Sequence, residues 1–355
     1  MTPTPRTLPP TADEIRETLV DRGFPVLSCQ ALDGDVSRRC YYRARLTDSG
    51  SAIVAWYPTD MRSTQVRFAT TTEWLQRAGV AVPRLLFQEE EAGWSLVEDA
   101  GPQTVHQVAS TGATPPSSVI DGWFHAATEH LSRFATLDPE SVSALNPSLD
   151  TSALEQELEQ TWRTFFEPRA LVPDLGLEKK LREALSWVCE SIGSKDLVPC
   201  HRDYMMRNLV LRSPSSNGSS GSAGDMDEEA TQSRAAAIPE IIVLDHQDLR
   251  LGPAAYDLAS LLNDSLFPSA RLEGELLELH CPSREQRQAY YQAAVQRTFK
   301  AVGTYSAFAQ RGNDRYLPLI PETLRRGLHH LAALDETRDL AQELLRRWSA
   351  QLHPT

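Results

Sequence analysis

VPCHRDYMMRN, residues 198–208, is the stretch on which the prediction of the fold rests, together with IIVLD at 241–245. Asp203 lies in a predicted loop, where its carboxylate can orient or deprotonate a hydroxyl group. Asn208 follows on the same loop, and Asp245 closes an apolar strand. Amide and carboxylate oxygens are the hard ligands that Mg²⁺ requires. The ordered trio therefore predicts a centre that holds a divalent metal beside a reacting alcohol.

Length and composition indicate a globular protein with two lobes or domains. The chain has 355 residues, more than a single hydrophobic core usually contains. Its 41% hydrophobic and 23% charged residues are ordinary for a globular protein, and no apolar run is long enough to span a membrane. The formal net charge of −13 argues against broad binding to nucleic acid or anionic membrane. It leaves room for a nucleotide held by Mg²⁺, a few arginines and backbone N–H groups.

The cysteines and the N-terminal residues predict a cytoplasmic location. Five scattered cysteines without CxxC spacing are typical of reduced thiols, not of disulfides or a zinc site. The first ten residues, MTPTPRTLPP, lack the apolar core of a signal peptide. Cys200 adjoins His201, but we expect it to be a buried strand residue rather than a nucleophile.

Hydrophobic periodicity predicts an α+β fold. Before Gly101 we expect helix 12–22 with Thr11 as its N-cap, strands 41–46 and 51–57, helix 64–78, and strands 80–87 and 94–98. Beyond it the expected helices are 123–137, 153–166, 177–192, 255–262, 284–310 and 323–351, interrupted by strands 209–211 and 241–244. The expected organisation is a small, mostly antiparallel β lobe at 1–101 and a larger, mostly helical lobe at 102–355.

The segment 213–239 differs in composition from the rest of the chain. It is rich in Ser, Gly, Ala and acidic residues and has almost no large apolar side chains, so it cannot bury enough surface to order itself. We expect an insertion without fixed structure between the two central strands, with its acidic run 225–229 solvated. Loop-closure entropy makes such an insertion thermodynamically mild.

Several blocks resemble the aminoglycoside phosphotransferase and choline kinase superfamily, which has a bilobal, protein-kinase-like fold. These blocks are GDVSRRCYYR (34–43), AGVAVPRLL (78–86), LVEDAG (96–101), HRDYMMRNLV (201–210) and LDHQDLRLGPAAYDLASLLND (244–264). AVQRTFKAVG (294–303) and RYLPLIP (315–321) resemble the branch of bacterial kinases that phosphorylate the anomeric hydroxyl of N-acetylmuramate and N-acetylglucosamine during cell-wall recycling. The resemblance extends from about residue 15 to residue 321.

The resemblance implies an ATP- and Mg²⁺-dependent sugar kinase. Asp203 would be the base or orienter for the acceptor hydroxyl, and Asn208 and Asp245 the Mg²⁺ ligands. The implied nucleotide-binding residues are Gly34, Ser37 and Arg39 and the backbone of Glu98, Asp99 and Ala100. His201 and Asp257 would support the loop; an ordinary carboxylate at a helix start is the alternative interpretation of Asp257.

Residues for the acceptor are expected around the same motifs. Arg207 lies in the loop, and Gln247 and Asp248 follow Asp245, where they could bond sugar hydroxyls. Gln296 and Lys300 are four residues apart on one helix face, within a block shared with the sugar-kinase branch. Lys300 could meet a lactyl carboxylate or the transferring phosphate.

One departure from the superfamily pattern affects the expected mechanism. The strand lysine that clamps the nucleotide phosphates is missing: Ala55 and Trp56 stand near its place, and the first lysine of the chain is Lys179. Phe68 is expected at the position of its usual glutamate partner, so the pair is lost together, and an unpaired Glu would cost stability. Three arginines could neutralise phosphate instead, namely Arg38, Arg39 and Arg43, although strand alternation could point some of them to solvent. We favour Arg39. His246, where Phe is common, is expected to be packed.

Two other functions are compatible with the sequence. The same reaction could use an aminoglycoside or a choline-like cation, which suits an acidic protein. The missing Lys–Glu pair also allows a nucleotide-binding pseudokinase, although the intact Asp203, Asn208 and Asp245 argue against it. In each case we expect a monomer or weak dimer that binds a small molecule, with no nucleic acid or membrane partner.

Overall fold

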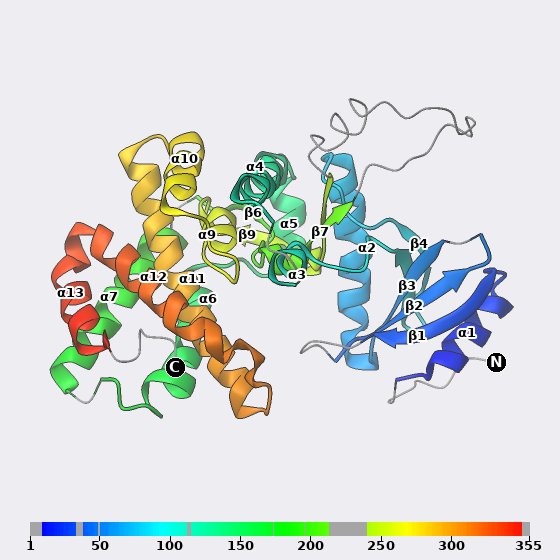
Figure 1. Ribbon diagram of the computed structural model, residues 1–355, viewed down its shortest axis with the longest axis horizontal. Helices are drawn as coiled ribbons and strands as arrows, with labels where there is room; N and C mark the ends of the chain where they lie inside the picture. Colours follow the sequence, from blue (N-terminus) through cyan, green and yellow to red (C-terminus); the bar gives the residue numbers. More distant parts are fainter. Residues whose placement is uncertain are drawn as a thin grey trace. The chain divides into compact units, whose positions relative to one another are not determined.

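The structure is a computed structural model that describes residues 9–32, 38–48, 50–111, 115–172, 174–194, 196–212 and 240–349. Gly34, Ser37 and the segment 213–239, which figured in the sequence predictions, lie outside these residues. The chain divides into two compact units, which are Met1–Thr104 with Leu209–Asp248 and Val105–Asn208 with Leu249–Thr355. The first unit carries an antiparallel sheet and the second is mostly helical (Figure 1), so the α+β class is confirmed.

The division differs from the single boundary expected at residue 101. The segment Leu209–Asp248 belongs to the first unit although the chain enters the second unit before it. β7 (Leu209–Arg212) pairs antiparallel with β8 (Glu240–Val243), and Val210 forms a bridge with Thr104. These backbone contacts attach the hairpin to the first unit. They also place Asp245 in that unit, whereas Asp203 and Asn208 belong to the second.

The five-stranded sheet has the order β1-β2-β3-β5-β4, with antiparallel neighbours throughout. Its strands are β1 (Val26–Leu32), β2 (Cys40–Leu46), β3 (Ser51–Trp56), β4 (Leu85–Glu89) and β5 (Trp94–Glu98). Alternate residues of β2 and β3, such as Tyr42 and Val54, are buried in a core that also contains Ile15 and Leu19. This alternation is why these segments form half-buried strands.

Local capping signals define the two helices of the first unit. α1 (Ala12–Asp21) starts with a capping box between Thr11 and Glu14. α2 (Arg62–Arg77) is followed by Gly79, whose φ of +75° favours glycine at the end of a helix. The strand expected at 80–87 begins only at Leu85, because Val80 continues the helix end by donating its N–H to the Leu75 carbonyl.

The second unit is built around α11 (Arg284–Gln310), which is 27 residues long and buried on most sides between Tyr290 and Ser306. It packs against α6, α7, α9 and α12 (Figure 1). The other helices of the unit are α3 (Val105–Ser110), α4 (Ser117–Phe134), α5 (Pro139–Leu145), α6 (Thr151–Thr161), α7 (Leu175–Gly193), α9 (Tyr256–Leu262), α10 (Ala270–His280), α12 (Ile320–Ala333) and α13 (Arg338–Arg347). Two short strands, β6 (Val198–Cys200) and β9 (Arg250–Gly252), pair antiparallel beside them.

Two helix predictions were wrong in detail. The helix expected at 323–351 is two helices, because Leu334 adopts an extended conformation between α12 and α13, and Thr337 Oγ1 donates a hydrogen bond to the Leu331 carbonyl (2.6 Å). The helix expected at 153–166 changes to a π-helical turn at Trp162–Phe166. None of the helices in the described parts of the chain combines the length and the apolarity needed to cross a membrane.

Candidate active site

Asp257, the second residue of α9, fixes the start of the 201–208 loop. Its carboxylate accepts hydrogen bonds from the backbone N–H groups of His201 (2.6 Å) and Arg202 (2.9 Å). Arg202 has a φ of +76°, which is costly for a residue with a side chain, so the loop needs such support. Burial raises the pKa of Asp257 to about 6. The ring of His201 is fully buried and packs against Phe134 and Tyr204.

Asp203 lies among three cations in the second unit. Lys300 Nζ is 3.4 Å and Arg297 Nη1 is 3.3 Å from its Oδ1, and Arg202 Nη1 is 3.8 Å from its Oδ2. Burial alone would raise the pKa of Asp203, but the charges of Lys300, Arg297 and Arg202 outweigh it and hold the pKa well below its usual range. Asp203 is therefore ionised before the reaction begins. Such a group accepts a hydrogen bond from a hydroxyl well and takes its proton only late in a reaction.

Asn208 closes the same loop. Its Nδ2 donates a hydrogen bond to the backbone carbonyl of Asp203 (2.9 Å), and its backbone N–H donates to the carbonyl of Met205 (2.7 Å). Because the amide nitrogen is used in this way, the amide oxygen is the atom left to act as a ligand. The fold thus brings Asp203 and Asn208 together.

Asp245 follows β8 in the first unit and has an unusual backbone. Its φ is +59°, a conformation that costs about 1 kcal/mol or more for a non-glycine residue and persists only where neighbours enforce it. Two donors meet its Oδ1: Arg39 Nη2 at 2.9 Å and Gln247 Nε2 at 2.8 Å. The Asp245 side chain is still 39% exposed, whereas that of Arg39 is 11% exposed. An accessible carboxylate is thus held by a nearly buried guanidinium.

α2 is joined to the residue after Asp245 by stacking and one hydrogen bond. The Phe68 ring stacks on the His246 ring with centroids 4.7 Å apart, and Thr71 Oγ1 lies 2.8 Å from His246 Nδ1. His246 is fully buried. The superfamily pattern predicts that this helix supplies the Glu of a Lys–Glu ion pair. In this chain Phe68 stands near that position and stacks on His246 instead.

The three arginines considered for phosphate binding have different surroundings. Arg38 pairs with Asp60 at the surface. Arg43 Nε and Nη2 donate hydrogen bonds to the carboxylate of Asp99, at 2.7 and 3.1 Å. Arg43 therefore holds the segment after β5 in place. Arg39 alone of the three contacts Asp245, as noted above.

Ala55 stands at the position of the missing lysine, and the residue that pairs with it across the sheet contacts Arg39. Ala55 of β3 pairs with Tyr41 of β2, and the Arg39 guanidinium lies over the Tyr41 ring at 5.7 Å. The small Ala55 side chain is nearly fully buried there. A cation therefore lies beside the expected position, delivered from the start of β2 instead of from β3.

The segment Glu98–Ala100 has a fixed side chain and an available backbone. The Asp99 carboxylate is almost buried; burial would raise its pKa, but hydrogen bonds from Ser51 and Arg43 lower it below the usual value. The side chain of Asp99 is thus fully engaged. Within the described residues, neither the N–H nor the C=O of Ala100 takes part in a hydrogen bond, which suits a backbone that meets a planar base.

Glu157 on α6 is a member of the Asp203 cluster that was not predicted. Its Oε1 lies 3.3 Å from Lys300 Nζ and 2.7 Å from Arg202 Nη2. Burial opposes its ionisation, but Lys300 and Arg202 lower the pKa of Glu157 to about 2. A carboxylate inside the buried stripe of Leu154 and Leu158 was the signal available in the sequence.

Gln296 does not face a ligand space as we expected. It is fully buried, and its Nε2 donates to Glu157 Oε2 (3.1 Å) and to the Leu154 carbonyl (3.3 Å). Its Oε1 accepts from the hydroxyl of Tyr256 (2.9 Å). The sequence placed Gln296 and Lys300 on one face correctly, but the structure has Gln296 holding Glu157 while Lys300 reaches Asp203.

The remaining residues predicted to bind the acceptor are distributed over both units. Arg207 forms a bidentate ion pair with the buried Asp264, at 2.9 and 2.7 Å, in the second unit. Gln247 and Asp248 belong to the first unit, and Gln247 is buried with its amide on Asp245. Their roles toward an acceptor stay predictions.

Asn208 and Asp245 fit Mg²⁺ in the chemistry of their donors. The part of the chain that the structure describes contains no group of three or more His, Cys, Asp and Glu side chains arranged to hold a metal. Mg²⁺ is commonly bound by one or two carboxylates with substrate phosphates and water completing its octahedron. The amide oxygen of Asn208 in the second unit and the exposed carboxylate of Asp245 in the first are each a donor of the kind that such a nucleotide-bound metal accepts.

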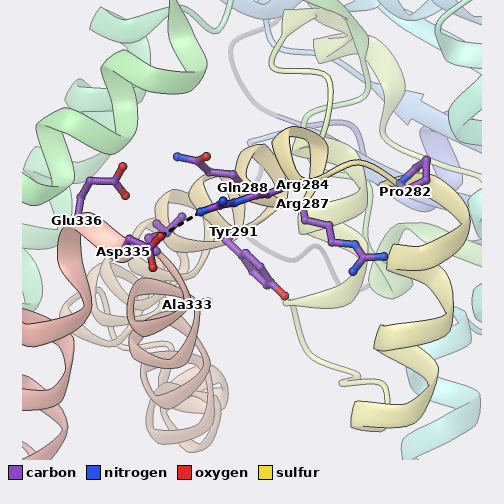
Figure 2. Close-up of a pocket in the computed structure, with 9 residues that line it drawn as sticks. Pro282, Arg284, Arg287, Gln288, Tyr291, Ala333, Asp335 and Glu336 are labelled. Carbon is purple, nitrogen blue, oxygen red and sulfur yellow. Dashed lines mark hydrogen bonds and ion pairs between the residues drawn. The ribbon is translucent and has the colours of Figure 1, made fainter.

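A hollow of about 340 Å³ lies elsewhere in the second unit (Figure 2). It is lined by the first turns of α11, including Arg284 and Tyr291, and by residues after α12, including Asp335, which Arg284 contacts at 3.2 Å. None of the predicted site residues lines it. We do not assign the reaction to this hollow.

Comparisons with known proteins identify the family and the fold of this chain. The model of the phosphotransferase enzyme family matches residues 28–221. A protein of Pseudomonas putida named N-acetylmuramate/N-acetylglucosamine kinase is 27% identical over 84% of this chain and 81% of its own, and its namesake in Pseudomonas aeruginosa is 28% identical over 82% and 80%. The solved structure of the ADP-bound aminoglycoside phosphotransferase APH(2'')-Ib is 12% identical, with a TM-score of 0.56 over 96% of this chain and 99% of that one. The last similarity concerns the fold alone and supports its kinase-like class.

Proposed function

We propose a specific reaction for this chain, which belongs to the phosphotransferase enzyme family. The proposed function is that of a kinase that transfers the γ-phosphate of ATP, with Mg²⁺, to the anomeric hydroxyl of N-acetylmuramate or N-acetylglucosamine. The observation that carries it is the state of Asp203, an ionised carboxylate held on a braced loop and surrounded by Lys300, Arg297 and Arg202. That arrangement suits a group that orients an alcohol toward a highly anionic donor.

The choice of acceptor rests on two arguments. The relatives named above as N-acetylmuramate/N-acetylglucosamine kinases match more than four fifths of this chain. Lys300 and Arg297 also present positive groups next to Asp203, at 3.4 and 3.3 Å, which suits a neutral or anionic sugar better than an aminoglycoside or choline-like cation. A nucleotide-binding pseudokinase would have no physical need for this costly group of buried charges.

The residues of the chain supply mainly positioning and electrostatics. The acceptor hydroxyl donates a hydrogen bond to the Asp203 carboxylate, which aims the hydroxyl oxygen at the γ-phosphorus and takes the proton as the new bond forms. Asp257 keeps the loop in place through its two backbone hydrogen bonds. Asn208 and Asp245 would hold Mg²⁺, which when bound neutralises charge on the nucleotide phosphates.

The nucleotide is assigned to the first unit. The free backbone groups of Ala100, next to Glu98 and Asp99, would bond the edge of the adenine. Arg39 would contribute a guanidinium to the phosphates, in place of the missing strand lysine. Its contact with Asp245 supports this, because a carboxylate destined for a metal and phosphates needs a neighbouring cation.

The test is Asp203→Asn, which keeps the shape and removes the charge. ADP release is measured with N-acetylmuramate, N-acetylglucosamine, kanamycin and choline, and ATP binding by calorimetry. We expect turnover of the amino sugars alone, a fall in kcat of about 10²–10⁴-fold in the variant, and unchanged ATP binding. Asp335→Asn, in the hollow of Figure 2, is the control and keeps full activity.

Two results would overturn the proposal. Retained turnover in Asp203→Asn removes the role of Asp203. ATP binding by the unmodified protein without ADP release on any acceptor identifies a pseudokinase instead.

A further inference from the structure

α11 brings two cations to the carboxylate that orients the acceptor. Arg297 and Lys300 are three residues apart, on one side of the helix, and both contact Oδ1 of Asp203, at 3.3 and 3.4 Å. Of the lysines that the structure describes, Lys300 is the least exposed: its side chain is 11% exposed, whereas that of Lys179 is 76% exposed. A buried lysine is costly unless it is paired or has a ligand.

Neither cation is saturated by its protein partners. The close pairs in the same unit are shorter: Arg202 to Glu157 is 2.7 Å, and Arg207 to Asp264 is 2.7 and 2.9 Å. The contacts of Arg297 and Lys300 with Asp203 exceed 3.2 Å, so they are loose by comparison.

Arg297 in particular has donors to spare. Its side chain is about 5% exposed, its Nη2 has only the weak acceptor Met205 Sδ at 3.6 Å, and its Nε, buried, lacks a partner within the described residues. A buried donor without an acceptor costs about 1–3 kcal/mol, so its persistence requires an explanation. An anion that binds beside Asp203 and satisfies these donors provides one.

We propose that Arg297 and Lys300 bind the transferring phosphoryl group and supply the positive charge that β3 lacks. This inference rests on the proposed function, since it places the γ-phosphoryl beside the hydroxyl that Asp203 orients. In the step, the bond from the γ-phosphorus to the bridging oxygen of ATP breaks and a bond to the acceptor oxygen forms. The acceptor proton passes to Asp203, and the bond electrons leave with ADP. Charge spreads over the phosphoryl oxygens in between, where two cations stabilise it most.

An acceptor carboxylate is the competing ligand. N-acetylmuramate carries its lactyl carboxylate on ring carbon 3, away from the anomeric hydroxyl that Asp203 would orient. Cations that contact Asp203 itself are better placed for the group reacting with that hydroxyl. Glu157 strengthens this placement, because its Oε1 lies 3.3 Å from Lys300 Nζ and helps to fix the ammonium group beside Asp203.

The test compares Lys300→Met with Lys179→Met, a matched control at the surface. Turnover is measured with both amino sugars. ADP binding with Mg²⁺ is measured by calorimetry, with and without aluminium fluoride, which mimics the transferring phosphoryl group. We expect Lys300→Met to lower kcat for both sugars by about 10²–10³-fold, to bind ADP as the unmodified protein does, and to lose the gain in ADP affinity that aluminium fluoride provides. Lys300→Arg, which keeps the charge, should retain part of that gain. Arg297→Lys tests the second cation in the same way, because it keeps a positive charge and removes the guanidinium donors.

Each other outcome contradicts the inference. An unchanged aluminium fluoride effect in Lys300→Met excludes a phosphoryl site. A loss confined to N-acetylmuramate assigns Lys300 to the lactyl carboxylate. The calorimetric measurement needs no acceptor, so it stays decisive even if the sugar assignment fails.

Discussion

Gly303→Ala tests the packing that positions Lys300. Gly303 lies one turn after Lys300 on α11, against α6, where Thr161 Oγ1 donates to the Phe299 carbonyl and Thr164 Oγ1 to the Gly303 carbonyl, both at 2.9 Å. A Cβ at Gly303 would lie 2.3 Å from Thr161 Oγ1 and 2.6 Å from Thr161 Cα. Because the second atom belongs to the backbone, no rotamer change relieves the clash. The helices must separate by roughly 1 Å to restore ordinary contact.

The magnitude follows from two opposing terms. Replacing glycine inside a helix gains about 1 kcal/mol of helix propensity, and overpacking a core costs about 1–3 kcal/mol. Gly274→Ala in α10 gives the propensity term alone, because it is exposed and a Cβ there meets nothing within 4 Å. We expect Gly303→Ala to be less stable than Gly274→Ala by about 1–3 kcal/mol, measured by urea denaturation.

The same variant should lose activity. A shift of about 1 Å in a positioning element costs on the order of 10²-fold in rate, and Lys300 would move away from Asp203. Turnover with N-acetylglucosamine measures this. Equal stability of the two variants, together with unchanged kcat, would show that the contact between α6 and α11 does not position Lys300.

Two further predictions concern buried charges in the second unit. Asp264→Asn leaves Arg207 without its bidentate partner and should lower the free energy of unfolding by about 3–5 kcal/mol, measured by urea denaturation. Glu275→Gln, which breaks the exposed pair with Arg271, should leave the urea midpoint unchanged. Equal midpoints for both variants would contradict the buried role of Asp264. Burial lowers the pKa of His330 to about 3 from an ordinary 6.5. The unfolded chain therefore binds a proton that the native state does not in this pH range, so stability is full above pH 6.5 and falls on acidification by about 1.4 kcal/mol per pH unit. His330→Gln should remove that part of the slope in denaturation series between pH 6.5 and 4.5, and parallel curves would refute it.

Local sequence signals predicted the elements and the chemistry that depend on neighbours in the chain. Thr11 is the N-cap of α1 as predicted, and the ends of α11 match the prediction residue for residue. The order of motifs placed Asp203 beside Asn208 in one loop. These features are predictable because each is set by contacts within a few residues or by the chemistry of one motif.

Features that depend on contacts between distant segments could not be predicted from the sequence. α11 is buried on most sides, so periodicity could not say which of its faces meets α6 and which meets Asp203. Gln296 was consequently assigned to the acceptor although it supports Glu157, and Glu157 was missed. The attachment of 209–248 to the first unit also depends on pairing with Thr104, which no local pattern reveals.

The absence of a lysine on β3 is best understood as a redistribution of charge and not as a loss. A lysine at Ala55 would need an acidic partner from α2, and Phe68 instead stacks on His246, so introducing the cation alone would bury an unpaired charge. In the first unit Arg39, the residue before β2, contacts Asp245. In the second, α11 carries cations with spare donors next to Asp203. Each cation has a carboxylate within its own unit, which keeps it tolerable before any phosphate arrives. The charge needed for phosphoryl transfer can therefore be present in the folded protein without the Lys–Glu pair.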